Sequence, residues 1–254
     1  MHIDVQGHGP DLVLIHGWAM HSGIFAPLTP LLAANFRVHL VDLPGHGRSI
    51  ADDDAVDPAA WAQRIAEAVP AAIWVGWSMG GLVALEAALS LPERVRGLVE
   101  IAESPRLLSA ADWPYGVAPQ ALIEFGEGLR LNYRRAIERF LALELVGSTN
   151  ATAGLRELRA RVFEYGEPSL RVLVDGLELL ETADLRARLP QLTMPSLWIA
   201  GRRDRLIRAE AMQWSAAQAP LGRYVEINSG HAPFISHAGE VAAAITAFAA
   251  ELPA

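Results

Sequence analysis

The sequence contains no cysteine among its 254 residues. This absence excludes disulfide bonds, cysteine-ligated zinc, iron–sulfur clusters and a thiol nucleophile, and it fits a reducing compartment. Long apolar runs are absent too, since none approaches the ~20 residues that a membrane span needs. The start, MHIDVQGHGPD, has neither the positive region nor the apolar core of a secretory signal. We therefore expect a cytoplasmic protein without a membrane partner.

The net charge of −8 argues against nonspecific binding of nucleic acid across the whole surface. With 52% hydrophobic and 20% charged residues, the chain is too apolar to be disordered. Its length suits one sizeable domain with a large core.

Short apolar runs rich in β-branched residues recur along the chain and are typical of buried strands. They cover residues 12–15, 38–41, 73–75, 98–101, 197–200 and 224–227. Helix-length segments lie between most of them or follow the last, at residues 58–69, 82–91, 209–219 and 239–252. This alternation predicts the α/β class, with a mostly parallel sheet flanked by helices.

The alternation breaks between residues 105 and 190, where helical patterns follow one another, most clearly at 130–146 and 155–165. A crossover that covers a sheet rarely needs so many residues. We therefore expect residues 105–190 to form an inserted helical lid over one end of the sheet. Residues 1–104 and 191–254 would then form the core domain.

The strongest local signal is Gly76-Trp77-Ser78-Met79-Gly80, a G-x-S-x-G pattern between an expected strand and an expected helix. A sharp turn there strains the serine backbone, so the neighbours two positions away must be small. The turn would lift Ser78 Oγ to a helix N-terminus, where backbone N–H groups favour an oxyanion. The simpler interpretation is a glycine-rich loop at an ordinary junction, but the context favours a nucleophile.

A serine hydroxyl needs a base to take its proton and a carboxylate to orient that base. Asp204 follows the expected strand 197–200, and His231 follows the strand 224–227. Both would lie at the same sheet edge as Ser78. Asp204 has the alternative interpretation of a surface turn residue. Five other histidines compete with His231 as the base, namely His8, His16, His21, His46 and His237.

An oxyanion hole needs two donors, and we expect the backbone N–H groups of Met79 and Trp18 to supply them. In this interpretation the His16 side chain braces the loop that carries Trp18. Trp18 and Trp77 have the alternative interpretation of core residues, but their positions flanking the serine favour walls of an acyl pocket. The glycine-rich turn at residues 42–49 is expected to be structural.

With the loop 16–18, the turn 42–49, the elbow 76–81, Asp204 and His231 all in order, the whole chain resembles the α/β-hydrolase superfamily. A narrower resemblance lies in residues 76–81, in ERFLAL at 138–143 and in HAPFISH at 231–237. These stretches resemble the pimeloyl-[acyl-carrier protein] methyl ester carboxylesterases of biotin synthesis, and the similarity runs from about residue 13 to residue 237.

That resemblance implies a serine carboxylic ester hydrolase without metal or cofactor, which cleaves the methyl ester of a pimeloyl group tethered to acyl-carrier protein. It implies Ser78 as nucleophile, Asp204 as acid and His231 as base, with Trp18 and Met79 at oxyanion and ligand positions. It also implies a substrate-contacting lid segment, made of Phe140, Leu141, Ala142, Leu143 and Glu144.

In the same family, basic lid residues dock the acidic carrier, and Arg135, Arg139 and Arg156 match them, while Thr152 replaces one family arginine. Independently, residues 130–161 carry seven arginines against three glutamates within a chain of net charge −8. The simpler interpretation is a solvated helix with pairs four residues apart. The excess favours an acidic partner, and we expect acyl-carrier protein to be that partner of a monomeric enzyme.

Two other function classes stay open. The first is a general short-chain carboxylesterase, lactonase or carbon–carbon hydrolase, which would share the same three catalytic residues. The second is a small-ligand receptor that keeps them on a hydrolase fold. A serine at position 78 disfavours epoxide hydrolases and haloalkane dehalogenases, which need a carboxylate nucleophile.

Overall fold

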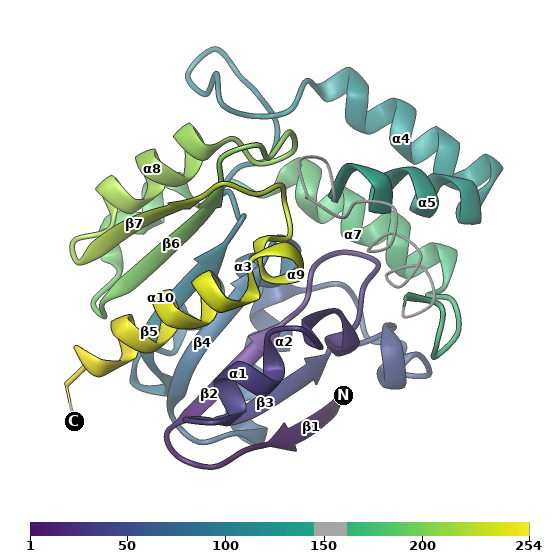
Figure 1. Cartoon of the computed structure of the whole chain (residues 1–254). Coiled ribbons are helices and arrows are strands. Elements are labelled where there is room, and N and C mark those ends of the chain that lie inside the picture. Colours follow the sequence, from purple (N-terminus) through teal and green to yellow (C-terminus); the bar gives the residue numbers. More distant parts are fainter. Residues whose placement is uncertain (145–161, 254) are drawn as a thin grey trace.

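A seven-stranded sheet forms the centre of the computed structural model, which describes residues 1–144 and 162–253 (Figure 1). The strands are β1 (His2–Gln6), β2 (Asp11–Ile15), β3 (Arg37–Asp42), β4 (Ala72–Trp77), β5 (Val95–Ile101), β6 (Ser196–Gly201) and β7 (Gly222–Ile227). Their order across the sheet is β1-β3-β2-β4-β5-β6-β7. β1 pairs antiparallel with β3, and the other pairings among the described strands are parallel. The α/β prediction is confirmed, and β1 is an additional edge strand that the apolar runs did not indicate.

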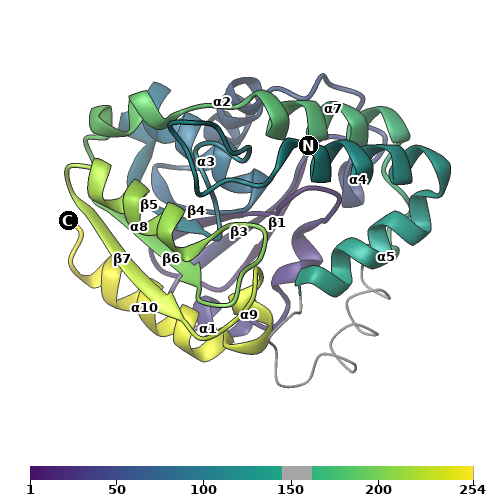
Figure 2. The same ribbon diagram turned by 90° about the horizontal axis from the view of Figure 1, so that it is seen from above.

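Helices cover both faces of the sheet. α1 (Thr29–Ala33) and α10 (Ala238–Ala250) lie on one face, and α2 (Pro58–Ala68) and α3 (Met79–Ser90) lie on the other (Figure 2). α8 (Ala209–Gln218) packs against β6 and β7. α3 is buried over most of its length because it packs against β4, β5 and α2. That sandwiched position explains why its sequence is apolar on nearly every side.

The N-terminal end of α2 shows how local sequence sets an element. Asp57 accepts hydrogen bonds from the backbone N–H groups of Ala59 and Ala60 at 2.9 and 3.2 Å, and Pro58 occupies the first helical position. Both features are typical helix starts, because the first N–H groups of a helix lack partners within it.

Between β5 and β6, the described residues form three longer helices and the short 3-10 helix η4 (Arg186–Gln191). The three are α4 (Pro119–Leu131), α5 (Tyr133–Glu144) and α7 (Leu170–Thr182). Figure 1 shows them beyond the ends toward which the arrows of the parallel strands point. None of the described helices combines the length and the apolar character needed to cross a membrane.

The prediction of one helix over residues 130–146 is wrong at its N-terminal end, because Arg130 and Leu131 are the last residues of α4. Asn132 separates the two helices, and its Oδ1 accepts the Arg135 N–H at 3.1 Å, as an N-terminal cap does. The helix expected at 155–165 lies largely outside the described residues, and of the described ones only residue 162 is helical.

Candidate active site

Ser78 lies at the junction of β4 and α3 in a backbone conformation that non-glycine residues rarely adopt, with φ 54° and ψ −126°. Such a conformation costs on the order of 1–3 kcal/mol and persists where the surrounding structure enforces it. Here the Ser78 N–H donates to the Ile101 carbonyl at 3.1 Å, and the Ser78 carbonyl accepts the Gly81 N–H at 2.8 Å. The strain is therefore held by β5 on one side and by the first turn of α3 on the other.

The glycines on either side of Ser78 allow the close approach that this turn requires. A Cβ atom on Gly76 would overlap the Gly81 backbone, and one on Gly80 would overlap the carbonyl oxygens of Ile15 and His16. Larger residues at either position would push α3 away from β2 and β4. The steric reasoning from the sequence therefore matches the packing of the turn.

Asp204 and His231 are joined by a hydrogen bond of 2.7 Å between Oδ2 of the carboxylate and Nδ1 of the ring. Their side chains are 0% and 2% exposed, so solvent does not compete for this bond. The second carboxylate oxygen accepts the N–H groups of Leu206 and Ile207 at 2.8 and 3.0 Å. With Nδ1–H donating to Asp204, Nε2 is the basic nitrogen of a neutral His231.

Trp77 fixes the backbone on which His231 sits. Its indole N–H donates to the His231 carbonyl at 2.9 Å, and the two rings lie 5.6 Å apart. Trp77 also meets Phe234 edge to face at 5.1 Å and is 1% exposed. The expectation that Trp77 lines an acyl pocket is therefore wrong, because its ring is buried in the core and does not line the cavity beside Ser78.

The histidines that compete with His231 have other surroundings. Burial lowers the pKa of His16 to about 3 and that of His46 to about 4, so both are neutral near pH 7. His237 Nδ1 lies 2.7 Å from Ser236 Oγ. His21 caps a short 3-10 helix by accepting the Gly23 N–H, and His8 is exposed. Among the described hydrogen bonds, the one from a histidine to Asp204 belongs to His231.

The loop that carries Trp18 lies directly against the elbow, because a Cβ atom on Gly17 would sit 3.1 Å from Ser78 Cβ. His16 braces this loop by donating from Nδ1 to the Gly17 carbonyl at 2.8 Å and accepting the Leu43 N–H at Nε2 at 3.0 Å. The Trp18 indole N–H donates to the Leu173 carbonyl of α7 at 2.9 Å. The loop, the elbow and α7 are thereby tied together at one place.

Asp42, the first residue of the glycine-rich turn, is fully buried and holds that turn through hydrogen bonds. Its two carboxylate oxygens accept the backbone N–H groups of Ser22 at 2.7 Å and Arg48 at 3.0 Å. These bonds account for an aspartate at this position without any part in catalysis.

A cavity of about 270 Å³ opens beside Ser78 and Trp18. Its walls are mostly apolar and come from α3, α4, α7 and the loops after β5 and β6. They include Leu82, Leu107, Leu122, Phe125, Leu177 and Leu180, with Ser104 and Arg205 as polar members. Sequence reasoning missed the contributions of α4 and α7, although both segments have apolar residues at the three-to-four-residue spacing of a helix that buries one face.

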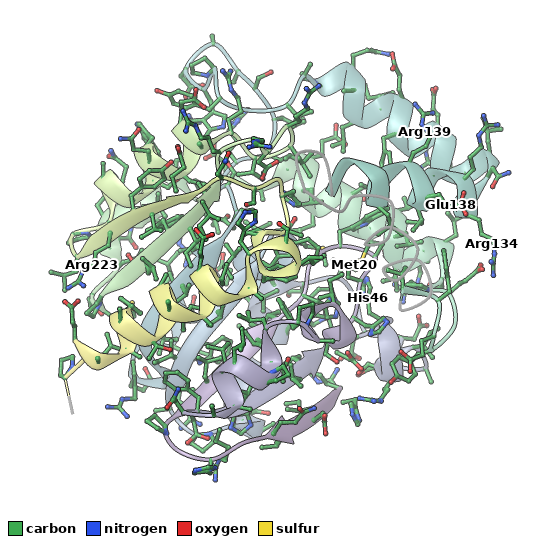
Figure 3. All side chains as sticks on the ribbon, viewed as in Figure 1. Met20, His46, Arg134, Glu138, Arg139 and Arg223 are labelled. Atoms are coloured by element: carbon green, nitrogen blue, oxygen red, sulfur yellow. The ribbon has the colours of Figure 1, made fainter. Side chains whose placement is uncertain are left out.

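The predicted lid residues lie partly within the described chain. Residues 140–144 belong to α5, where Leu141 is completely buried, and the side chains of the other four are outside what the structure describes. Arg135 and Arg139 are exposed on α5, and Arg156 lies outside the described residues. Figure 3 shows Arg134, Glu138 and Arg139 at the side of the molecule that α4 and α5 form. Arg134 pairs with Glu167 at 2.5 Å.

Metal ligands do not cluster in the described chain: within residues 1–144 and 162–253, no group of three or more His, Asp or Glu side chains is placed to hold a metal ion.

Comparisons with known proteins match this architecture. The family model described as "Alpha/beta hydrolase family" matches residues 12–244. The chain is 53% identical over 253 residues to the pimeloyl-[acyl-carrier protein] methyl ester esterase of Stenotrophomonas maltophilia strain K279a, covering 99% of this chain and 97% of that protein. It is 50% identical to the protein of the same name from Xanthomonas oryzae pv. oryzae strain MAFF 311018, covering both chains completely.

Among solved structures, an esterase from Exiguobacterium antarcticum superposes with a TM-score of 0.90 at 20% identity, covering 98% of this chain and 95% of that one. At that identity the likeness concerns the fold. Together with the full-length relatives, these matches show that the chain belongs to the alpha/beta hydrolase family.

Proposed function

We propose that this chain is a serine esterase that hydrolyses the methyl ester of a pimeloyl group carried on acyl-carrier protein, releasing methanol and the free carboxylate. The observation that carries the proposal is the position of Ser78, strained at the elbow and opening into an apolar cavity at the sheet edge where Asp204 and His231 are joined. The full-length relatives with 50–53% identity bear the name of this activity.

In the first half of the reaction, Ser78 Oγ attacks the ester carbonyl while His231 Nε2 takes the hydroxyl proton. Asp204 holds the ring in the required tautomer and stabilises the imidazolium that forms. The negative charge that develops on the carbonyl oxygen meets the backbone N–H groups of Trp18 and Met79. Because these donors are fixed before the reaction, their orientation costs nothing at the transition state.

Collapse of this tetrahedral intermediate breaks the bond to the methoxy group, which leaves as methanol with the proton from His231. In the second half, His231 takes a proton from water, and the resulting hydroxide attacks the acyl–Ser78 ester. The second tetrahedral intermediate expels Ser78 Oγ, which regains its proton from His231. The products are methanol and a carboxylic acid that ionises on release.

The cavity suits the methylene chain of such a substrate. Each methylene group transferred from water to an apolar wall contributes about 0.8 kcal/mol, so a chain of several methylenes binds by burial without charged contacts. The walls supplied by Leu122 and Phe125 of α4 and by Leu177 of α7 come from the segment between β5 and β6. We therefore assign residues 105–190 the role of a lid that completes the acyl pocket.

The carrier would dock on the exposed side of this lid. Arg135 and Arg139 are exposed on α5, and neither guanidinium has an ion pair within the described residues. Acidic surfaces are attracted to such cations over about the 8–10 Å Debye length at moderate salt. Arg156 belongs to the same proposed docking set.

A specificity comparison tests the proposed substrate. The kcat/KM values for the carrier-bound methyl ester, the same acyl methyl ester on pantetheine alone and a simple lactone are measured in one buffer. We expect the carrier-bound ester to be the best substrate by roughly tenfold or more over the pantetheine ester, because only it reaches the basic lid. A lactone or the carrier-free ester turning over faster would instead favour a general lactonase or short-chain esterase.

A further inference from the structure

Two carboxyl groups outside the proposed catalytic set are buried under the nucleophile elbow. Glu100 lies near the end of β5 and Glu103 three residues later, and they are 0% and 1% exposed. None of their four carboxyl oxygens has a hydrogen-bond partner in the part of the chain that the structure describes. Burying an unpaired carboxylate is strongly unfavourable, so the protonation state of these two side chains needs a physical explanation.

Both carboxyl groups touch the helix that carries the nucleophile. A Cβ atom on Gly81, the third residue of α3, would overlap Glu100 Oε2 and the Glu103 side chain. The Gly81 N–H in turn donates to the Ser78 carbonyl at 2.8 Å. The path from the carboxyl pair to Ser78 therefore runs through one residue and one hydrogen bond.

In the part of the chain that the structure describes, the strands beside the pair offer it no positively charged side chain. Within the sheet, Glu100 lies between Gly76 of β4 and Trp198 of β6, and neither strand carries an ionisable side chain. From α8, the Met212 sulfur accepts the Glu103 N–H at 3.2 Å.

The ionisable residues of the packed helices point to other partners. Glu86 of α3 pairs with Arg188 of η4 at 2.6 Å, and Glu210 of α8 pairs with Arg208 at 3.7 Å. Among the described residues, the dominant charged neighbour of Glu100 is therefore Glu103 itself. Burial raises the pKa of both carboxyls well above the ordinary value, and for Glu100 the nearby Glu103 adds to the rise.

We propose that Glu100 and Glu103 are positioning residues for the esterase reaction: the active enzyme keeps at least one of the two carboxyls protonated, and ionisation of the pair at alkaline pH displaces the first turn of α3 and lowers turnover at Ser78. The inference rests on the proposed function for its kinetic consequence. Its protonation claim concerns the folded chain and stands without any substrate.

Two physical effects would follow from ionisation of the pair. Two adjacent carboxylates repel each other and require water, and neither can be accommodated without moving the Gly81 backbone that touches them. A negative charge on Glu100 or Glu103 would also offset the partial positive charge at the N-terminus of α3. That partial charge stabilises the oxyanion that forms beside Ser78 during the reaction. Both effects lower kcat more than they change KM, since neither carboxyl lines the cavity.

The kinetic test compares kcat with p-nitrophenyl butyrate from pH 6 to 10 in the wild type, Glu100→Gln, Glu103→Gln and the double variant. Ser78→Ala supplies the blank for chemical hydrolysis, and exposed Glu93→Gln is the matched control. We expect wild type and Glu93→Gln to lose about tenfold in kcat on the alkaline side at nearly constant KM. The double variant should lose less than about twofold, because glutamine cannot release a proton. The same alkaline profile in the wild type and the double variant would overturn the proposal.

A second measurement needs no substrate. In the unfolded chain a glutamate ionises near pH 4.3, whereas the native pair keeps its proton to higher pH. The stability that the pair contributes is therefore complete below about pH 4.3 and is lost as the pH rises toward the native pKa. The unfolding equilibrium constant is measured in urea between pH 5 and 8 for the wild type and the double variant, and the ratio of the two constants is compared across pH. This ratio, wild type over double variant, should rise about tenfold per pH unit for each proton that the native pair keeps and the unfolded chain loses. A ratio independent of pH would contradict the inference.

If the double variant does not fold, infrared difference spectroscopy of the wild type takes the place of the unfolding comparison. The carbonyl band of a protonated, buried carboxylic acid should be present at pH 7, and its absence would contradict the inference. If the unfolding or infrared result holds while the carrier-bound ester is not cleaved, the proposed function fails and the protonated pair stands. If the carrier-bound ester is cleaved but neither the unfolding result nor the infrared result is obtained, the proposed function stands and the inference about Glu100 and Glu103 is wrong.

Discussion

His231 Nδ1 lies 2.7 Å from Asp204 Oδ2, and both side chains are sealed from solvent. The other oxygen of Asp204 is held by two backbone N–H groups, so the carboxylate cannot rotate freely. This arrangement orients the imidazole ring without any help from substrate.

Asp204→Asn should lower kcat on the order of 10⁴-fold, because the amide favours the wrong tautomer of His231. Asp175→Asn, at a half-buried position of α7 whose carboxylate pairs with Arg171, is the control and should retain full activity. The measurement is steady-state hydrolysis of p-nitrophenyl butyrate, with circular dichroism to confirm folding. Activity within tenfold of the wild type in Asp204→Asn would show that another group is the acid.

Leu122→Trp should narrow the acyl cavity, which Leu122 lines from α4. Excluding two methylenes of the acyl chain removes about 1.6 kcal/mol of burial, so kcat/KM for a seven-carbon acyl ester should fall about tenfold. An acetyl ester should be cleaved at nearly the wild-type rate. The control is Leu131→Trp, at an 87% exposed position of the same helix, which should affect neither ester. Equal losses for both chain lengths would place the acyl chain elsewhere.

Reversing the charge of Arg135 and Arg139 should weaken docking of the carrier. Each exposed contact is worth roughly 0.2–1 kcal/mol, so the double Arg→Glu variant should lose roughly two- to thirtyfold in kcat/KM on the carrier-bound ester. Hydrolysis of small esters should be unchanged, and the wild-type rate on the carrier should decline as salt rises. Arg208→Glu with Arg223→Glu gives the matched charge change, on exposed residues that lie just before α8 and in β7. A loss common to both substrates would indicate a damaged lid instead.

Acid should destabilise the fold through His16 and His46, whose pKa values are lowered to about 3 and about 4 by burial. In the unfolded chain both take up protons below about pH 6.5, while the folded chain does not. Stability is therefore present above that pH and is lost as the pH falls toward 4. The measurement is the unfolding equilibrium constant in urea as a function of pH. Its rise with falling pH should be weaker in His46→Gln than in the wild type, by up to about tenfold per pH unit, and should be unchanged in the control His8→Gln, at an exposed position. An unchanged slope in His46→Gln would show that His46 is already protonated in the fold.

Much of the fold follows from patterns within single elements. Six strands were predicted from apolar runs, and five of them, β2 to β6, are largely buried, as strands covered on both faces are. The sixth, β7, is a partly exposed edge strand. β1 escaped prediction because it is an edge strand in which polar and apolar residues alternate, from His2 to Gln6. The strand-to-helix turn around Ser78 was predictable because its sterics involve residues adjacent in sequence.

Other parts depend on contacts between distant segments. The cavity walls at Phe125 and Leu177 belong to α4 and α7, which meet Ser78 only after the chain between β5 and β6 has folded back over the sheet. Glu100 interrupts an apolar run that was assigned to a strand, and nothing local indicates that its carboxyl would be buried beside Glu103. The proposed oxyanion hole, made by the backbone N–H groups of Trp18 and Met79, also joins distant segments and stays a prediction.

The most direct measurement incubates wild type and Ser78→Ala with pimeloyl-carrier methyl ester and weighs the intact carrier by mass spectrometry. The account predicts that wild type converts the carrier to a species lighter by one CH₂ unit, with methanol as the other product. Ser78→Ala should fold normally and convert it at least about 10⁴-fold more slowly. An unchanged carrier mass with wild type, or comparable conversion by Ser78→Ala, would contradict it.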